Sequence, residues 1–352
     1  MEKQVRVSLC VIALNEEKYI GDLFENIRNQ DYDHKDMEVI LVDGGSSDRT
    51  KPLMEEFREK ETSFARVEVL DNPKKIQPAG WNVAIRASRG ELIIRVDAHA
   101  KIPSDFVRQN VACIDEGEDV CGGTRTNIID GSQFGRKVLL MAENSMFGSG
   151  IAAYRNSGEK KYVRTVAHAC YKREVFDKVG LFNETLLRSE DNEMHYRIRK
   201  SGYKICMSDT IRSEYQTRTT LKRMLRQKYG NGKWIGITSA GISPEIFSLY
   251  HFVPFLFVLA ALACAVLFVL AFIPPLPYWL GVPFLAGVAL YLVFDLALTL
   301  KSCKDYREWR AVFVLPFLFP LLHFAYGFGT LAGFFSFRTI GKLKEQEKNR
   351  KN

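Results

Sequence analysis

Three apolar runs in the N-terminal part of the chain each end in polar residues. The first run is followed by Asn15 and Glu16, the second by Asp43, and the third by Asp97 and His99. Such side chains can bind a ribose or a base, and they can hold a divalent cation that neutralises a diphosphate. The pattern predicts a nucleotide-diphosphate site.

The second of these polar segments reads Asp43-Gly-Gly-Ser-Ser-Asp48. Its glycines let the backbone approach a ligand, and a carboxylate can accept a hydrogen bond from a base or a ribose hydroxyl. We expect ligand contact for Asp43, whereas Asp48 fits a cap of the following helix better. Because no G-x-G-x-x-G follows the first run and no G-x-x-x-x-G-K-[ST] occurs, a dinucleotide oxidoreductase or a P-loop enzyme is disfavoured.

The third segment reads Asp97-Ala98-His99. On extended backbone the two polar side chains point the same way, so they could hold one divalent cation. Mixed oxygen and nitrogen ligands suit Mn²⁺ or Mg²⁺. The alternative is a strand-end aspartate beside an incidental histidine.

A further acidic pair, Glu190 and Asp191, precedes a helix-like run from Met194 to Lys200. Acids are common at helix N-termini because they oppose the helix dipole, so capping explains the pair by itself. The functional interpretation is a general base, because a hydroxyl nucleophile must lose its proton to a nearby group.

The elements that must position these residues alternate between two periodicities. Strands are expected at Val5–Leu14, Met37–Val42, Val67–Leu70 and Leu92–Val96, and helices at Glu17–Gln30, Ser47–Glu59 and Pro78–Ser88. This order predicts a parallel sheet covered by helices, with ligands at the carboxyl ends of the strands.

Composition divides the chain into two regions. Among 352 residues, 47% are apolar and 26% charged, which excludes disordered and collagen-like proteins. However, Asp295 is the only Asp, Glu, Lys or Arg residue of the sequence between Phe247 and Thr299. Residues 1–246 are charged like a soluble protein. We expect a catalytic domain at 1–215, an interfacial region at 216–246, a transmembrane domain at 247–337 and a basic tail at 338–352.

Segments 247–273 and 276–300 are each long enough to cross a membrane. The basic loop Lys301–Arg310 then lies in the cytoplasm, as does the catalytic domain. Segment 311–337 either spans the membrane or re-enters it, because its prolines and glycines interrupt it and the basic tail favours the cytoplasm. The protein is expected in the cytoplasmic (inner) membrane.

Basic and apolar residues alternate in Thr219–Ile237, which favours a helix in the headgroup plane over a solvated basic helix. Gln227 and Trp234 in this segment could border an acceptor site, although anchoring at the interface suits Trp234 better. The net charge is +8, and because nucleic-acid-binding motifs are lacking, anionic lipid is the expected counter-charge and no nucleic acid is expected to bind. Seven scattered cysteines favour neither a disulfide framework nor a zinc site.

Taken in order, Asn15-Glu16, Asp43 to Asp48, Asp97-Ala98-His99 and Glu190-Asp191 resemble the inverting glycosyltransferases of family 2. Two further segments, Pro103–Phe106 and Tyr326–Thr330, make the chain similar to succinoglycan-type exopolysaccharide glucosyltransferases of bacterial membranes. The resemblance implies an α/β GT-A domain followed by an interfacial amphipathic helix and α-helical transmembrane segments.

The resemblance also implies roles. Asp43 would contact the base. The segment Ala13–Glu16, which includes Asn15, would line the nucleoside. Asp97 and His99 would hold the diphosphate through the cation, and Asp191 would be the base. His99 stands where the fold usually has a second acid, which leaves Mn²⁺ or Mg²⁺ open. No Arg-Trp pair follows Gln227 at the spacing of processive synthases, so processivity is not predicted.

The expected activity is transfer of a hexose from a nucleotide-diphosphate sugar, in particular a UDP-sugar, to a hydroxyl of a polyprenyl-diphosphate-linked saccharide. One alternative is a polyprenyl-phosphate sugar synthase, which uses a phosphate nucleophile. Another is a non-catalytic nucleotide-sugar or lipid-binding membrane scaffold or transporter. The sequence leaves the sugar, the linkage and the oligomeric state open.

Overall fold

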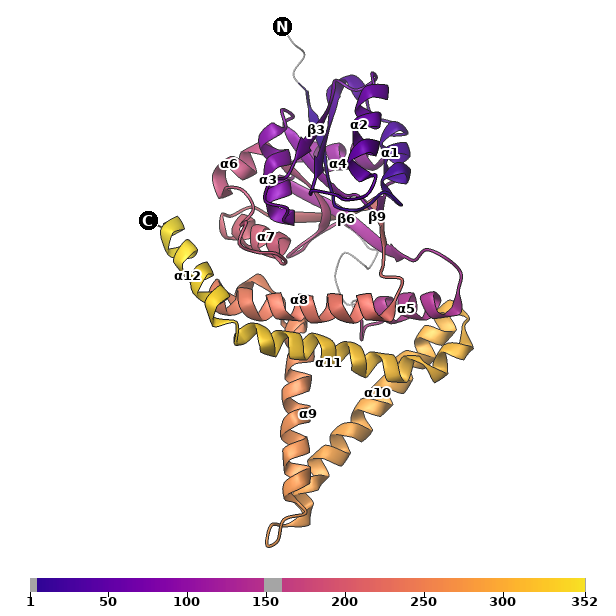
Figure 1. The fold of residues 1–352 in the computed structure, drawn as a ribbon, viewed down its shortest axis with the longest axis vertical. Coiled ribbons are helices and arrows are strands. Elements are labelled where there is room, and N and C mark those ends of the chain that lie inside the picture. Colours follow the sequence, from indigo (N-terminus) through magenta and orange to yellow (C-terminus); the bar gives the residue numbers. More distant parts are fainter. Residues whose placement is uncertain (1–4, 149–159, 352) are drawn as a thin grey trace. The chain divides into compact units, whose positions relative to one another are not determined.

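A computed structural model describes residues 5–148 and 160–351. These residues form two compact units (Figure 1). The α/β unit contains residues up to Ile128 and from 160 to Gln216, and the helical unit contains residues 129–148 and those from Thr217 onwards. Sequence analysis did not anticipate that the segment after Ile128 groups with the C-terminal helices.

The α/β unit is built on a nine-stranded mixed sheet in the order β3-β2-β1-β4-β8-β6-β9-β5, with β7 paired to β9. Strands β3, β2, β1 and β4 are parallel, whereas β8 is antiparallel to both of its neighbours, β4 and β6. The strands are β1 (Val7–Ala13), β2 (Met37–Asp43), β3 (Arg66–Asp71), β4 (Leu92–Asp97), β5 (Ala100–Lys101), β6 (Val120–Ile128), β7 (Lys161–Tyr162), β8 (Ala167–Lys172) and β9 (Ile205–Gln216).

Helices connect the strands and cover both faces of the sheet. They are α1 (Ile20–Arg28), α2 (Thr50–Lys60), α3 (Gln77–Ala87), α4 (Phe106–Asp115), α6 (Arg173–Val179) and α7 (Glu190–Lys200). The four strands and three helices expected from the sequence are all present, with boundaries shifted by up to three residues. Their apolar spacing was sufficient to predict them, because both faces of a covered parallel sheet are buried.

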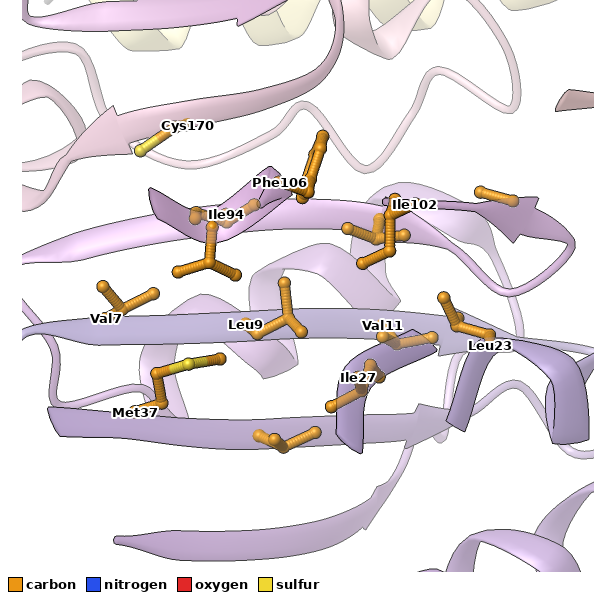
Figure 2. Packing of buried hydrophobic residues seen from close by; sticks show 14 of the residues in the cluster. Val7, Leu9, Val11, Leu23, Ile27, Met37, Ile94, Ile102, Phe106 and Cys170 are labelled. Carbon is orange, nitrogen blue, oxygen red and sulfur yellow. The ribbon is translucent and has the colours of Figure 1, made fainter. Parts of the chain in front are cut away.

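Alternating residues of each central strand supply two cores. Leu9 and Val11 of β1 pack in one core with Leu23 and Ile27 of α1 (Figure 2). The neighbouring Cys10 belongs to the other core, together with side chains from α3 and α6. Since strand side chains alternate between faces, one strand anchors helices on both sides.

The register of the parallel strands brings the polar segments to one edge. Ala13 at the end of β1 pairs with Asp43 at the end of β2, and Ile12 pairs with Asp97 at the end of β4. The three loops that carry the predicted site residues therefore leave the sheet at the same level.

The helical unit contains α5 (Phe134–Asn144), α8 (Leu221–Gly241), α9 (Val253–Leu270), α10 (Val282–Tyr306), α11 (Leu315–Phe334) and α12 (Phe337–Lys351). Helices α8 and α11 lie side by side (Figure 1). Their contact depends on glycines: a Cβ on Gly232 would come within 2.0 Å of the Tyr326 carbonyl oxygen, and one on Gly333 within 2.2 Å of the Lys233 carbonyl oxygen. Small residues permit this close backbone approach.

In the part of the chain that the structure describes, three helical segments are long and apolar enough to cross a membrane: Leu249–Leu270, Tyr278–Tyr306 and Leu315–Phe334. The first two are covered by few other residues, whereas a larger part of the third is buried against its neighbours. Segments expected from hydropathy are thus present as helices, and the protein has the composition of a membrane protein.

Candidate active site

The ends of β1 and β2 are joined by a network of hydrogen bonds. Asn15 adopts a left-handed backbone conformation, with φ +56°. Its backbone N–H donates to Ser46 Oγ (2.9 Å), and its side-chain oxygen accepts from the Ser47 backbone N–H (2.9 Å). The expected nucleoside-lining residue therefore fixes the two loops to each other.

Asp43 is buried, with 2% of its surface exposed. Its carboxylate accepts hydrogen bonds from the backbone N–H groups of Gly45 (3.0 Å) and Ser46 (3.1 Å). The carboxylate thus shapes the glycine turn, and contact with a base stays a prediction. Asp48 likewise accepts backbone N–H groups, from Thr50 (3.0 Å) at the start of α2 and from Glu17 (3.2 Å), which fits the capping interpretation.

Asp97 at the end of β4 is held by a histidine that sequence analysis did not place beside it. His168 of β8 lies 3.3 Å from Asp97 through Nε2 and 2.9 Å from Ser213 Oγ through Nδ1. Burial would raise the pKa of Asp97, but the hydrogen bond and the charge of His168, with the nearby His99 and Arg125, hold that pKa well below its usual range. Asp97 is therefore an ionised, fixed carboxylate.

His99 is oriented by Glu16. The Nδ1 atom of His99 lies 3.0 Å from Glu16 Oε1, and the ring packs edge-on against Tyr215. The other ring nitrogen, Nε2, is buried and has no hydrogen-bond partner among the described residues. A histidine whose one nitrogen is fixed by a carboxylate while the other is free has the arrangement typical of a metal ligand.

The donor set for a cation is small. Across residues 5–148 and 160–351, no three His, Cys, Asp or Glu side chains gather in a way that could hold a metal ion. Asp97 and His99 nevertheless fit a cation that takes its remaining ligands from phosphate oxygens and water, as Mg²⁺ commonly does. Glu16, expected to line the nucleoside, contacts His99, and its contact with a nucleoside stays a prediction.

Asp191 lies in the first turn of α7 and is paired with an arginine from the sheet. Arg95 Nη1 donates to Asp191 Oδ1 at 2.6 Å. Arg95 precedes Asp97 by two residues on β4, so this ion pair connects the acidic turn of α7 to the strand that carries the expected cation ligands. The Asp191 side chain is 41% exposed, which leaves it accessible to a substrate.

Glu190, the neighbour of Asp191, is buried. Burial, followed by the negative charge of Asp191, raises the pKa of Glu190 well above the usual carboxyl range. The preceding residue, Ser189, adopts a left-handed conformation with φ +66° and makes no side-chain cap. The pair is thus not a simple helix cap: one acid is buried and favours its protonated form, and the other is exposed and ion-paired.

Left-handed backbone recurs around these residues. Asn15, His168 and Ser189 all have positive φ, and each directly contacts or adjoins a candidate site residue. Non-glycine residues adopt this conformation at an energetic cost, and they are frequent at functional sites.

The structure brings most of the predicted residues to one edge of the sheet but not all. Contacts link Glu16 to His99, and the Arg95 pair links Asp191 to β4. Gln227 and Trp234 lie on α8 of the helical unit, where no contact tests their predicted role. The contacts of His168 with Asp97 and of Arg95 with Asp191 were not predicted. A charged Arg95 within the apolar run Leu92–Val96 was the available signal for the second, since a buried charge requires a partner.

The chain has clear sequence relatives. The family model described as glycosyl transferase family 2 matches residues 8–180. Succinoglycan biosynthesis protein ExoA of Rhizobium meliloti is 33% identical over 231 residues, 64% of this chain and 68% of that protein. A protein of Methanococcus voltae, named dolichyl N-acetyl-alpha-D-glucosaminyl phosphate 3-beta-D-2,3-diacetamido-2,3-dideoxy-beta-D-glucuronosyltransferase, is 26% identical over 328 residues, 92% of this chain and 95% of that one.

A solved structure shares the fold. It is the mannosyltransferase PcManGT from Pyrobaculum calidifontis in complex with GDP-Man and Mn²⁺. The two structures superpose with a TM-score of 0.59 at 17% sequence identity, over 90% of this chain and 86% of the PcManGT chain. This similarity confirms the expected GT-A-like α/β domain.

Proposed function

Because the chain belongs to glycosyl transferase family 2, we propose that it moves a hexose from a nucleotide-diphosphate sugar, in particular a UDP-sugar, to a hydroxyl of a polyprenyl-diphosphate-linked saccharide. That it is a glycosyltransferase follows from the family; donor and acceptor are the proposal. The observation that carries the acceptor chemistry is the exposed carboxylate of Asp191, held beside the strand that ends at Asp97.

In this reaction the acceptor oxygen forms a bond to the anomeric carbon of the sugar. The bond from that carbon to the diphosphate breaks, and its electron pair leaves with the nucleoside diphosphate. The hydroxyl proton passes to the Asp191 carboxylate, which acts as general base. Inversion follows from direct attack opposite the leaving group.

Asp97 and His99 are the residues that would hold a divalent cation, with Glu16 orienting His99. Such a cation would neutralise charge on the departing diphosphate. The Mn²⁺ named in the PcManGT complex supports this proposal, and the GDP-Man of the same complex supports a nucleotide-diphosphate sugar as the class of donor. Mn²⁺ and Mg²⁺ are both compatible with the donor set.

The acceptor is proposed to be a lipid-linked saccharide. The name of the Methanococcus voltae relative specifies transfer to a sugar carried on a dolichyl phosphate, and ExoA is named for the biosynthesis of an exopolysaccharide. A bare polyprenyl phosphate is the competing acceptor. Because a phosphate nucleophile is already ionised, only a saccharide hydroxyl requires Asp191 as a base.

We further propose that α9 and α10 cross the membrane while α11 lies along its surface, which differs from the spanning or re-entrant expectation. Phe324 and Phe334 are about 15 Å apart along α11 at 1.5 Å per residue. They nevertheless contact Phe257 and Phe255, only two residues apart on α9. The two helix axes therefore cross steeply, as Figure 1 illustrates.

The surface of α11 supports this placement. One side of α11 packs on α8 through Gly329 and Gly333. By contrast, Phe317 near the start of α11 is 72% exposed, and Phe335, which follows its last residue, is 65% exposed. An in-plane α11 leaves two crossings, so that both the loop at Lys301–Arg310 and the basic tail lie in the cytoplasm with the α/β unit. A periplasmic signal from a C-terminal reporter would contradict this topology.

The activity is tested by nucleotide release from UDP-, GDP- and TDP-sugars by the purified protein in detergent, with a lipid-linked saccharide acceptor. We expect release from one donor with Mn²⁺ or Mg²⁺ and none with chelator. Release without transfer to any acceptor would contradict the transferase proposal, and full activity in chelator would contradict the cation.

A further inference from the structure

Arg95 occupies an unusual position for a charged residue. It lies in the middle of β4, between Ile94 and Val96, and only 6% of its surface is exposed. Its guanidinium carbon lies over two aromatic rings, 4.1 Å from the Trp81 ring centroid and 4.5 Å from that of Phe182. The rings restrict the plane of the guanidinium group, because cations stack favourably on aromatic faces.

The stacked guanidinium group has one carboxylate partner. Nη1 donates to Asp191 Oδ1 at 2.6 Å, while Nε is buried without a hydrogen-bond partner among the described residues. Stability does not account for this arrangement, since taking a charged guanidinium group out of water is costly, and replacing such buried charges by apolar residues of similar volume is neutral or stabilising in many proteins. An arginine that leaves one donor unsatisfied in a hydrophobic strand therefore calls for another explanation.

The histidine on α7 that lies near this pair has other hydrogen-bond partners. His195, one turn after Asp191 on α7, is hydrogen-bonded to Tyr171 (2.9 Å) and Thr165 (2.8 Å). Burial lowers the pKa of His195 to about 3, so the ring is neutral and does not compete for the Asp191 carboxylate. Asp191 Oδ1 is thus committed to Arg95, and across the described residues the structure shows no partner for Oδ2.

We infer that Arg95 is a positioning residue: packed against the rings of Trp81 and Phe182, it holds Asp191 Oδ1 so that Oδ2 is directed to the acceptor hydroxyl. This inference rests on the proposed function of Asp191 as general base. A base must stay within hydrogen-bond reach of the proton that it takes, and displacement by about 1 Å can cost about 10²-fold in rate.

Replacing Arg95 by lysine and by methionine should have different effects on turnover. Arg95→Lys keeps a charge that can reach the carboxylate but loses the planar group that the two rings hold. Arg95→Met keeps the apolar volume of the side chain and removes the charge. A positioning role ranks wild type above Arg95→Lys and Arg95→Lys above Arg95→Met in turnover.

The test measures kcat, donor KM, donor affinity by calorimetry and thermal unfolding for both variants, with Arg66→Met as control. Arg66 pairs with Glu38 and Glu68 near the opposite ends of the strands, so its loss removes an arginine with carboxylate partners away from the site. We expect Arg95→Met to lower kcat about 10²-fold with donor KM and affinity changed less than about twofold. Arg95→Lys should recover at least part of the rate, and Arg66→Met should keep kcat.

Three results would overturn the inference. One is an unchanged kcat in Arg95→Met. Another is a loss of donor affinity or melting temperature that matches the loss of rate, which indicates a structural role. The third is equal loss in Arg95→Lys and Arg95→Met. By contrast, a wild-type protein that transfers no sugar contradicts the proposed function itself, so the two failures are distinguishable.

Discussion

The polar residues at the edge of the sheet fall into two groups that are held in different ways. In the turn group, Asp43 and Asp48 accept backbone N–H groups from nearby loops. In the pair group, Asp97, His99 and Asp191 are each held by a side chain from another element: His168, Glu16 and Arg95.

This difference separates residues that order a loop from residues that can take part in the reaction. Carboxylates whose oxygens are occupied by backbone groups order a loop, because unpaired buried N–H groups are costly. Side chains that are fixed through one atom and keep another atom free can bind a cation or accept a proton. Replacements in the turn group should therefore affect stability, whereas those in the pair group should affect turnover.

Among the variants that test the residues holding the cation and the turn, the largest effect is expected for Asp97→Ala. Losing this carboxylate removes a cation ligand, and we expect kcat to fall about 10²- to 10³-fold, as when one charge-stabilising group is removed from an active site. The matched control is Asp71→Ala at the end of β3, where the carboxylate pairs with Lys51. Similar turnover losses in both variants would erase the distinction between the two groups.

A smaller effect is expected for Glu16→Gln, which weakens the orientation of His99. The concentration of Mn²⁺ needed for half-maximal activity should rise about tenfold or more, because partners that orient metal ligands contribute about 10- to 100-fold in affinity. Manganese affinity is also measurable by calorimetry with the donor nucleotide alone. The control is Glu17→Gln, because the Glu17 carboxylate accepts a hydrogen bond from the Arg49 backbone N–H. This variant should leave the manganese affinity unchanged.

Asp43→Ala tests the turn group directly. It leaves the N–H groups of Gly45 and Ser46 without their partner, so the free energy of unfolding should fall by about 1–3 kcal/mol. Asp43→Asn keeps one acceptor oxygen and should recover part of that loss. If both variants lose donor affinity and keep full stability, Asp43 belongs with the ligand-binding residues instead.

The smallest effect is expected for Glu190→Gln and depends on pH. Asp191, Arg95 and Asp97 face Glu190, and burial with the Asp191 charge raises its folded-state pKa. Above the ordinary carboxyl pKa, the unfolded chain releases a proton that the folded protein keeps, so the free energy of unfolding falls as pH rises toward the raised pKa.

Glutamine has no proton to lose and removes this pH-dependent loss. The melting temperature of Glu190→Gln relative to wild type should therefore increase between pH 5 and pH 8. Glu174→Gln, at an exposed position, should show no such trend. A difference that is constant over this range would mean that Glu190 is ionised in the folded protein.

Much of the architecture could be predicted from the sequence. The strand and helix periodicities from Val5 to Val96 are local, and the parallel order follows from their alternation. The remaining strands, β5 to β9, pair across long separations and in both directions, so local patterns could not define them. The grouping of α5 with the C-terminal helices depends on tertiary contacts for the same reason.

The candidate site was predicted unevenly for a related reason. Asp97, His99 and Asp191 stand out by residue type and position at the ends of elements. Their partners do not: Arg95 and Asp191 are 96 residues apart, and His168 and Asp97 are 71 apart. Sequence spacing reveals which groups can do chemistry, but the fold decides which groups hold them.

The most direct test of the account compares two acceptors for Asp191→Asn and wild type. Transfer to a hydroxyl of a polyprenyl-diphosphate-linked saccharide requires a base, whereas transfer to a polyprenyl phosphate does not. We predict that wild type uses the saccharide and that Asp191→Asn loses this transfer while it still binds the donor nucleotide. Transfer to polyprenyl phosphate that survives in Asp191→Asn would contradict the account and identify the protein as a polyprenyl-phosphate sugar synthase.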